Sequence, residues 1–231
     1  MSEKVRNMFA DIADDYDRIN SILSFGVHNA WRKKTVQMSR AEAGDRVLDC
    51  ATGTGDLAFE FKKKVGHSGS VMGTDFCKEM IEHAPDKADK KKLVVEFEVA
   101  DAMDLPYDDN SFDVASIAFG IRNVDDPLLC LQEMARVVKP GGTVVVLEFG
   151  QPGGIVKYPY QFYSKYVMPT VGGLISGNRD AYTYLPETSA KFPAGPAFID
   201  LMDEAGVFRK KESESLTGGI AYVYVGTVKD N

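Results

Sequence analysis

Short apolar runs alternate with helix-forming segments through the middle of the chain. The predicted strands, rich in Val, Ile and Leu, are 46–51, 70–74, 93–99, 112–118 and 143–149. The predicted helices between them are 57–65, 78–89 and 127–138. The sequence Lys-Pro-Gly-Gly at 139–142 predicts a stop before the fifth strand. This alternation predicts an α/β fold with a mostly parallel sheet covered on both faces.

Two segments do not follow the alternation. Residues 1–40 have apolar positions at helical spacing, broken near 24–26, and 151–195 form a Tyr- and Phe-rich insertion. After the insertion, a helix is predicted at 197–206, followed by two closing strands, 208–215 and 220–228. We expect one domain over 1–231, divided into an N-terminal helical part (1–40), a core (41–150), the insertion (151–195) and a closing part (196–231).

Composition and charge favour small-molecule chemistry. The chain has 231 residues, 44% of them hydrophobic, and a net charge of -7, which argues against a nucleic-acid partner held through its phosphates. The acidic N-terminal residues do not fit a targeting peptide, and no apolar run has the length of a membrane span. Three cysteines, Cys50, Cys77 and Cys130, predict small core residues in a reducing compartment. We therefore expect a cytoplasmic protein.

A glycine-rich turn follows the first predicted strand, in the sequence VLDCATGTGDLA at 47–58. Gly53, Gly55 and Ala58 fit the G-x-G-x-x-G/A pattern of dinucleotide-binding folds. A nicotinamide or flavin cofactor is therefore the first candidate, and a plain tight turn between strand and helix is the alternative.

Acidic residues near the ends of successive strands favour a different nucleoside. Asp75 ends the second strand and suits a ribose diol, in NAD and S-adenosylmethionine alike. Asp56 lies where a dinucleotide would place its pyrophosphate, and with Asp49 it would favour the cationic methionine part of S-adenosylmethionine. Asp101 could accept from an adenine amino group, with the Ala102 amide donating to the ring. Helix capping by Asp56 and Asp75 is the simpler alternative.

The chain resembles a known family along most of its length. The segments VLDCATGTGDLA, GTDF, VADAMDLPYDDNSFD, FGIRNV and LQEMARVVKPGGTVVVLEF are similar to the ubiquinone/menaquinone-biosynthesis C-methyltransferases, which are class I S-adenosylmethionine-dependent enzymes. YDRINSILSFGVHNAW, YQFYSKYVMPTVGGLISG and AYTYLPETSAKFP resemble the family's substrate-side segments. Because these lie outside the shared cofactor fold, the resemblance extends to function as well as fold.

The resemblance implies a Rossmann-like class I methyltransferase: a seven-stranded, mostly parallel sheet with an antiparallel closing strand, an N-terminal helical lid and a cap insertion after the fifth strand. It implies S-adenosylmethionine as the cofactor, S-adenosylhomocysteine as its product, and no metal. The expected cofactor-binding residues are Asp49, Thr52, Gly53, Thr54, Gly55, Asp75, Phe76, Asp101, Ala102, Met103 and Ala118. Family members often have serine at the position of Ala118, so a hydroxyl contact is missing there.

The implied reaction is transfer of a methyl group to a ring carbon of a polyprenylated quinol, such as demethylmenaquinol. A benzoquinol acceptor is an open alternative. The enzyme must align the two reactants and help to remove a proton. The expected catalytic residues are Arg122, Asn123, Tyr16 and His28, with Asp17 as a further contribution from the lid.

Arg122 and His28 each have an alternative reading. Since arginine stays protonated in proteins, Arg122 is expected to stabilise a phenolate or orient a water, unless it only pairs with Asp125 or Asp126. His28 is the obvious general base because histidine titrates near neutral pH. It could equally fix the turn at 24–31 through a hydrogen bond.

Two surfaces are expected to meet the lipid substrate. In the insertion, one helical face is predicted from Tyr158, Phe162, Tyr163 and Tyr166, extended by Met168, Val171, Leu174 and Ile175. This stripe is either a cap over the isoprenoid or ordinary core. A patch of Trp31, Arg32, Lys33 and Lys34 could touch the inner face of the cytoplasmic membrane, or be a solvated helix face. A homodimer is also compatible with the sequence.

Three other functions compete with quinol methylation. A methyltransferase for another small apolar or phenolic acceptor shares the same cofactor residues. An NAD-dependent oxidoreductase is disfavoured by the acidic series, and a silent binding module would need a purely structural Arg122.

Overall fold

The computed structural model describes residues 3–176 and 179–230. Seven strands form one sheet in the order β3-β2-β1-β4-β5-β7-β6. Their bounds are β1 Arg46–Cys50, β2 Ser70–Asp75, β3 Glu96–Val99, β4 Phe112–Ala118, β5 Val138–Phe149, β6 Phe208–Leu216 and β7 Ala221–Val228. The first five strands are parallel, and β7 pairs antiparallel with both β5 and β6. The predicted sheet with antiparallel closure is confirmed.

Apolar cores on the two faces of the sheet hold it together. Buried residues of β1, β4 and β5 contribute to both cores because successive side chains of a strand point to opposite faces. The covering helices are α3 Val27–Met38, α4 Asp56–Val65, α5 Lys78–Ile81, α6 Ala84–Lys91, α7 Pro127–Val137 and α11 Pro196–Glu204. All three cysteines are buried and free, as the sequence predicts.

The third strand begins at Glu96 rather than at 93, and two further boundaries differ for identifiable reasons. The helix expected at 78–89 is divided into α5 and α6, because Pro85, in the first turn of α6, has no amide hydrogen to continue the preceding helix. The expected stop at 139–142 lies inside β5, where the register with β4 shifts between Phe112 and Val114. Pairing therefore resumes after an exposed irregularity rather than starting there.

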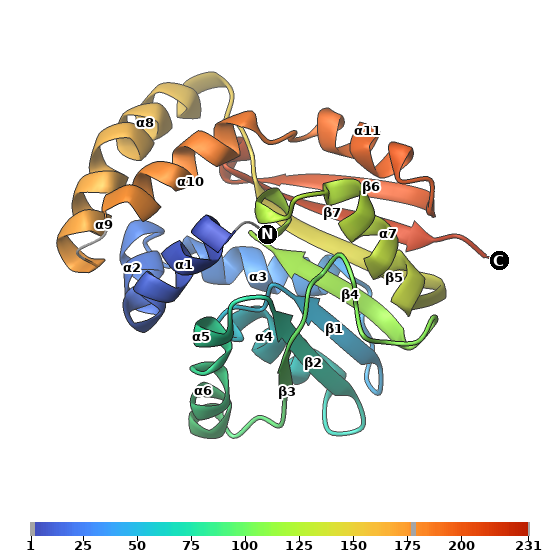
Figure 1. Ribbon diagram of the computed structural model, residues 1–231. Coiled ribbons are helices and arrows are strands. Elements are labelled where there is room, and N and C mark those ends of the chain that lie inside the picture. Colours follow the sequence, from blue (N-terminus) through green and yellow to red (C-terminus); the bar gives the residue numbers. More distant parts are fainter. Residues whose placement is uncertain (1–2, 177–178, 231) are drawn as a thin grey trace.

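The remaining helices gather at one end of the sheet, where α1 and α2 lie beside α8, α9 and α10 (Figure 1). Their bounds are α1 Glu3–Ile12, α2 Tyr16–Leu23, α8 Lys157–Phe162, α9 Met168–Ser176 and α10 Arg179–Lys191, with a π-helical turn at Tyr163–Val167 joining α8 to α9. We call α1–α3 the lid and 154–191 the cap. Ile12, Ile19 and Leu23 of the lid form a separate small core with Met168 and Tyr182 of the cap.

Candidate active site

The turn after β1 depends on its glycines. Ala51, Gly53 and Gly55 all have positive φ, at 48°, 57° and 88°. A Cβ on Gly55 would lie 2.8 Å from the Phe59 ring, so glycine is required there for space as well as for conformation. The turn places the Gly53 amide at the carboxyl edge of the sheet.

Two of the predicted carboxylates organise this edge. Asp75 accepts hydrogen bonds from the Gly53 amide at 2.9 Å and the Cys77 amide at 2.8 Å. Burial raises the pKa of Asp75, although these amides lower it. Asp101 accepts from the Met103 amide at 2.9 Å. Each carboxylate keeps lone pairs that a ligand could use.

A small cavity of about 70 Å³ lies between these loops and the lid. The predicted cofactor residues that line it are Gly53, Asp75, Phe76, Asp101, Ala102 and Ala118. Asn123 and the lid residues Phe9 and Tyr16 close it. The structure thus brings six of the predicted cofactor residues to one site.

The other five, Asp49, Thr52, Thr54, Gly55 and Met103, do not line this cavity. Asp49 is buried and accepts hydrogen bonds from the hydroxyls of Thr52 at 2.7 Å and Ser116 at 2.6 Å. Burial raises the pKa of Asp49 to about 6, although both hydroxyls lower it. Asp49 and Thr52 therefore support the turn, and cofactor contact by these five residues stays a prediction.

An ionic network ties the lid to the glycine turn. Thr54 donates to Asp17 of α2 at 2.6 Å, and Lys87 of α6 donates to Asp17 at 2.5 Å and to Thr54 at 2.8 Å. Asp56 pairs with Lys87 at 2.9 Å and with Arg32 of α3 at 3.2 Å. Burial raises the pKa of Asp56, but the two cations outweigh it and the pKa is lowered.

The prediction that the charge of Asp56 favours a cationic ligand over a pyrophosphate is therefore not supported. Two cations already compensate its carboxylate, so its charge does not discriminate between a cationic methionine group and an anionic pyrophosphate. The signal missed was Arg32, because its approach to Asp56 depends on how the lid packs.

A second cavity, of about 410 Å³, lies between the lid, the cap and the ends of β4 and β5. Its lining is mostly aliphatic and aromatic, and its polar side chains are those of Tyr16, Asn20, Ser24, His28, Arg32, Arg122, Tyr160, Tyr163, Tyr182, Tyr184 and Thr217. Phe9, Tyr16 and Phe119 line both cavities, so the two are neighbours. The size and the mostly apolar lining are typical of a site for a small apolar ligand.

Arg122 is held at the wall of the large cavity by a partner that the sequence analysis missed. It donates to Glu148 at 2.6 Å and to the Phe119 carbonyl at 2.7 Å, and its side chain and that of Glu148 are 5% and 1% exposed. Burial raises the pKa of Glu148, although Arg122 lowers it. Among the described atoms, Arg122 Nε and Glu148 Oε2 are buried without a hydrogen-bond partner. A charged residue ending the apolar run of β5 was the available signal.

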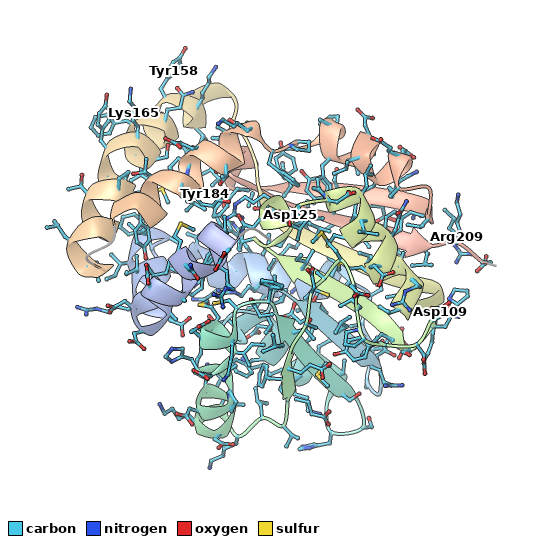
Figure 2. The ribbon with its side chains drawn as sticks, in the orientation of Figure 1. Asp109, Asp125, Tyr158, Lys165, Tyr184 and Arg209 are labelled. Carbon is cyan, nitrogen blue, oxygen red and sulfur yellow. The ribbon has the colours of Figure 1, made fainter. Side chains whose placement is uncertain are left out.

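Asn123 and Tyr16 lie beside this pair. Asn123 donates to the Phe119 carbonyl at 3.3 Å and accepts from the Tyr184 hydroxyl of α10 at 3.1 Å. Figure 2 shows Tyr184 on the cap, on the side toward the rest of the molecule. Burial raises the pKa of Tyr16, so its phenol stays protonated near neutral pH. Tyr184 is a further cavity residue that the sequence did not single out.

His28 also lines the large cavity. Its Nδ1 is hydrogen-bonded to the Ser24 hydroxyl within the lid turn. Burial and the nearby Arg32 lower the pKa of His28, so the imidazole is neutral at pH 7. The geometry is compatible with both predicted roles, the turn-fixing hydrogen bond and the proton acceptor.

The expected surfaces are arranged differently from the prediction. Trp31 is buried and donates to Thr217 at 2.9 Å, Arg32 pairs with Asp56, and Lys34 pairs with Glu214 at 2.8 Å. The prediction of an exposed basic and aromatic patch there is wrong. The predicted cap stripe is divided too: Tyr163 and Met168 line the cavity, whereas the members that point to solvent are Tyr158, Phe162, Tyr166 and Leu174.

The sheet order, the glycine turn after β1 and the carboxylates after β2 and β3 define an S-adenosylmethionine-dependent methyltransferase fold. A SAM-dependent methyltransferase, possible histamine N-methyltransferase, from Thermotoga maritima superimposes with a TM-score of 0.68 at 22% identity, covering 96% of this chain and 98% of that one. A SAM-dependent methyltransferase from Aquifex aeolicus gives a TM-score of 0.60 at 21% identity, covering 85% and 89%.

The family is narrower than the fold. A model of the ubiE/COQ5 methyltransferase family matches residues 1–228, and the chain belongs to that family. A ubiquinone/menaquinone biosynthesis C-methyltransferase UbiE from Bdellovibrio bacteriovorus is 56% identical, covering 98% of this chain and 97% of its own length. A demethylmenaquinone methyltransferase from Oceanobacillus iheyensis is 42% identical, covering 97% and 94%.

Proposed function

We propose that the chain transfers the methyl group of S-adenosylmethionine to a ring carbon of a polyprenylated quinol of the demethylmenaquinol type. Membership in the ubiE/COQ5 family makes it a methyltransferase, and relatives over nearly the full length are named for C-methylation in quinone biosynthesis. The observation that carries the proposal is the apolar cavity of about 410 Å³ beside the smaller cavity that collects the predicted cofactor residues.

The small cavity has the chemistry of a nucleoside site. Asp75 suits the ribose hydroxyls, and Asp101 with Ala102 suits the adenine edge, since both carboxylates line the cavity with lone pairs to spare. Its volume of about 70 Å³ is smaller than the engineered cavity of about 150 Å³ that binds benzene. We therefore expect Phe9 and Tyr16 of the lid to move when the cofactor binds.

Arg122 is the residue that we assign to charge stabilisation. S-adenosylmethionine supplies an electrophilic methyl group on a sulfonium. The quinol ring becomes nucleophilic at carbon as its adjacent hydroxyl loses a proton, and a buried guanidinium favours the resulting phenolate. Glu148 accepts a hydrogen bond from Arg122 and so positions this residue, which lines the cavity. Asn123 and Tyr184 join the cap to this wall.

His28 is the proton acceptor that the cavity best supports. If Nδ1–H donates to Ser24, Nε2 holds the lone pair that a general base needs. Because the pKa of His28 is lowered, turnover should fall only at acid pH, below the ordinary histidine range. We expect His28→Gln to lose this acid limb and about a hundredfold in kcat. A pH–rate profile unchanged by the substitution would leave His28 with the turn-fixing role alone.

The decisive experiment is methyl transfer by the purified chain to short-tailed demethylnaphthoquinol and demethylbenzoquinol kept under reductant. Mass spectrometry of the product is expected to show one added methyl on ring carbon, and comparison of kcat/KM separates the two ring classes. Tight S-adenosylhomocysteine binding without transfer to either quinol would overturn the proposal and leave a binding module or another acceptor. NADH binding at the small cavity would overturn the cofactor assignment.

A further inference from the structure

The outer side of the cap carries large apolar side chains that are exposed, because no other described part of the chain covers them. We call this surface the apolar face. Its members are Ile155, Tyr158, Phe162, Tyr166 and Leu174 of the cap, together with Phe25 of the lid turn, whose ring centroid lies 6.2 Å from that of Tyr163 in the cap. Phe162 and Tyr166 touch each other, with ring centroids 5.2 Å apart. A concentration of exposed aromatic and aliphatic side chains usually marks an interaction site.

Phe25 shows that this exposure is built in rather than incidental. It is 83% exposed and has φ +50°, a left-handed conformation that is costly for a bulky residue. The following Gly26 is left-handed as well, and Tyr163 of the cap donates to the Leu23 carbonyl at 2.5 Å, which holds the turn against the cap. The turn therefore holds the Phe25 ring toward solvent at a cost in backbone strain.

The helical segment behind this face is apolar on both sides. Tyr160, Tyr163 and Met168 line the large cavity, while Tyr158 and Leu174, 73% and 81% exposed, point outward. Phe25 belongs to both the cavity lining and the apolar face, so the cavity adjoins this surface.

The charged residues of the segment that carries most of the apolar face have one sign. Residues 149–176 contain no Asp or Glu, in a chain whose net charge is -7, and their charged residues are Lys157 and Lys165. Figure 2 shows Tyr158 and Lys165 projecting from the outer side of α8 and the turn that follows it. Tyrosine and lysine are the side chains that favour the boundary between lipid and water, and lysine is attracted to anionic headgroups.

We propose that the apolar face docks on the surface of an anionic phospholipid bilayer. A second copy of the chain fits less well, because a two-fold interface uses the same surface on both copies and would bury Lys157 and Lys165 from each against a surface without carboxylates in 149–176. None of the described helices is long and apolar enough to cross a membrane, so the contact would be interfacial. Docking would place Phe25, where the large cavity adjoins this face, at the leaflet. A role for that placement in substrate entry rests on the proposed function, whereas docking itself does not.

The test is flotation of the purified chain with phosphatidylcholine vesicles, with and without phosphatidylglycerol. We expect the wild type to float with the anionic vesicles, and Lys157→Glu/Lys165→Glu to lower partitioning about tenfold or more on them. Phe162→Ser/Leu174→Ser should lower it on both vesicle types. The matched controls are Val94→Ser, which removes an exposed apolar residue outside the face, and Lys90→Glu, which reverses an exposed charge on α6.

A wild type that stays at the bottom of the gradient with anionic vesicles would overturn the proposal. So would variants that float as well as the wild type, or a wild-type dimer in sedimentation that Leu174→Ser separates without any vesicle binding. The four face substitutions lie outside the cavity lining, so they should retain methyl transfer to a short-tailed quinol in solution. If the wild type showed no methyl transfer to the short-tailed quinol, that result would count against the proposed function and leave the docking proposal intact.

Discussion

The carboxyl edge of the sheet and the helix-lined cavity above it differ in how their polar groups are satisfied. At the edge, Asp49, Asp75 and Asp101 accept hydrogen bonds from hydroxyls and amides of the strand ends and their loops. At the wall of the large cavity the polar groups are fewer, and Arg122, which lines the cavity, forms with Glu148 a buried ion pair that leaves one atom of each side chain without a hydrogen-bond partner among the described residues. The edge is built from hydrogen-bonded carboxylates, two of which keep lone pairs for a ligand, whereas the cavity wall is built around one buried and incompletely satisfied ion pair.

The largest effect is expected from removing the positive charge of Arg122 from the wall of the large cavity. Arg122→Ala should lower kcat about a hundredfold to a thousandfold, because a positioned donor for a developing oxyanion is lost, while the affinity for S-adenosylhomocysteine changes little. Steady-state kinetics and calorimetric titration measure the two quantities. Turnover should fall without a loss of cofactor affinity because Arg122 lines the large cavity and not the small one.

Folding has to be controlled in this experiment because Arg122→Ala leaves Glu148 buried without its partner. Breaking a buried pair on one side costs about 3–5 kcal/mol. The double variant Arg122→Ala/Glu148→Gln should regain thermal stability but not turnover. A folded double variant with near-normal kcat would show that the pair is structural only.

The edge should respond to pH through stability. Since burial raises the pKa of Asp49 to about 6, the folded chain keeps a proton that the unfolded chain has lost between about pH 4 and pH 6. The free energy of unfolding contributed by this group therefore falls by about 3 kcal/mol as pH rises through that window. Asp49→Asn should remove this dependence, as measured by denaturant unfolding at pH 4 and pH 7.

The matched control is Asp89→Asn, at an exposed carboxylate of α6. It should leave the slope of stability against pH as in the wild type. If Asp49→Asn retained the full wild-type slope, Asp49 would not be the group that holds a proton in the folded chain between about pH 4 and pH 6.

The smallest effect is expected where the two regions are joined. Lys87→Met removes the cation that links Asp17 of the lid to the glycine turn, with side chains of Lys87 and Asp17 that are 20% and 40% exposed. Because solvent screens such pairs, we expect about 1 kcal/mol, seen as release of S-adenosylhomocysteine about fivefold faster in stopped-flow displacement. Lys90→Met on the same helix is the control. Identical release rates for both variants would mean that the lid opens without breaking this network.

The same contrast explains what the sequence could predict. The edge is local: the glycine turn and Asp75 are set by strand ends and short loops, so the fold, and the gathering of six predicted cofactor residues around one cavity, followed from pattern and resemblance. The cavity joins 8–32 with 119–122 and 149–220, and no local pattern reports how such segments meet. This is why Arg32 was assigned to a surface and why Glu148 and Tyr184 were missed.

The small core between lid and cap also has a consequence for biosynthesis of the chain. Ile12 and Ile19 leave the ribosome about 150 residues before Met168 and Tyr182, on which they pack. The lid should therefore be the last part to settle, after the sheet has formed. Nascent chains that lack the cap would then expose the apolar residues of α1 and α2, to which chaperones could bind.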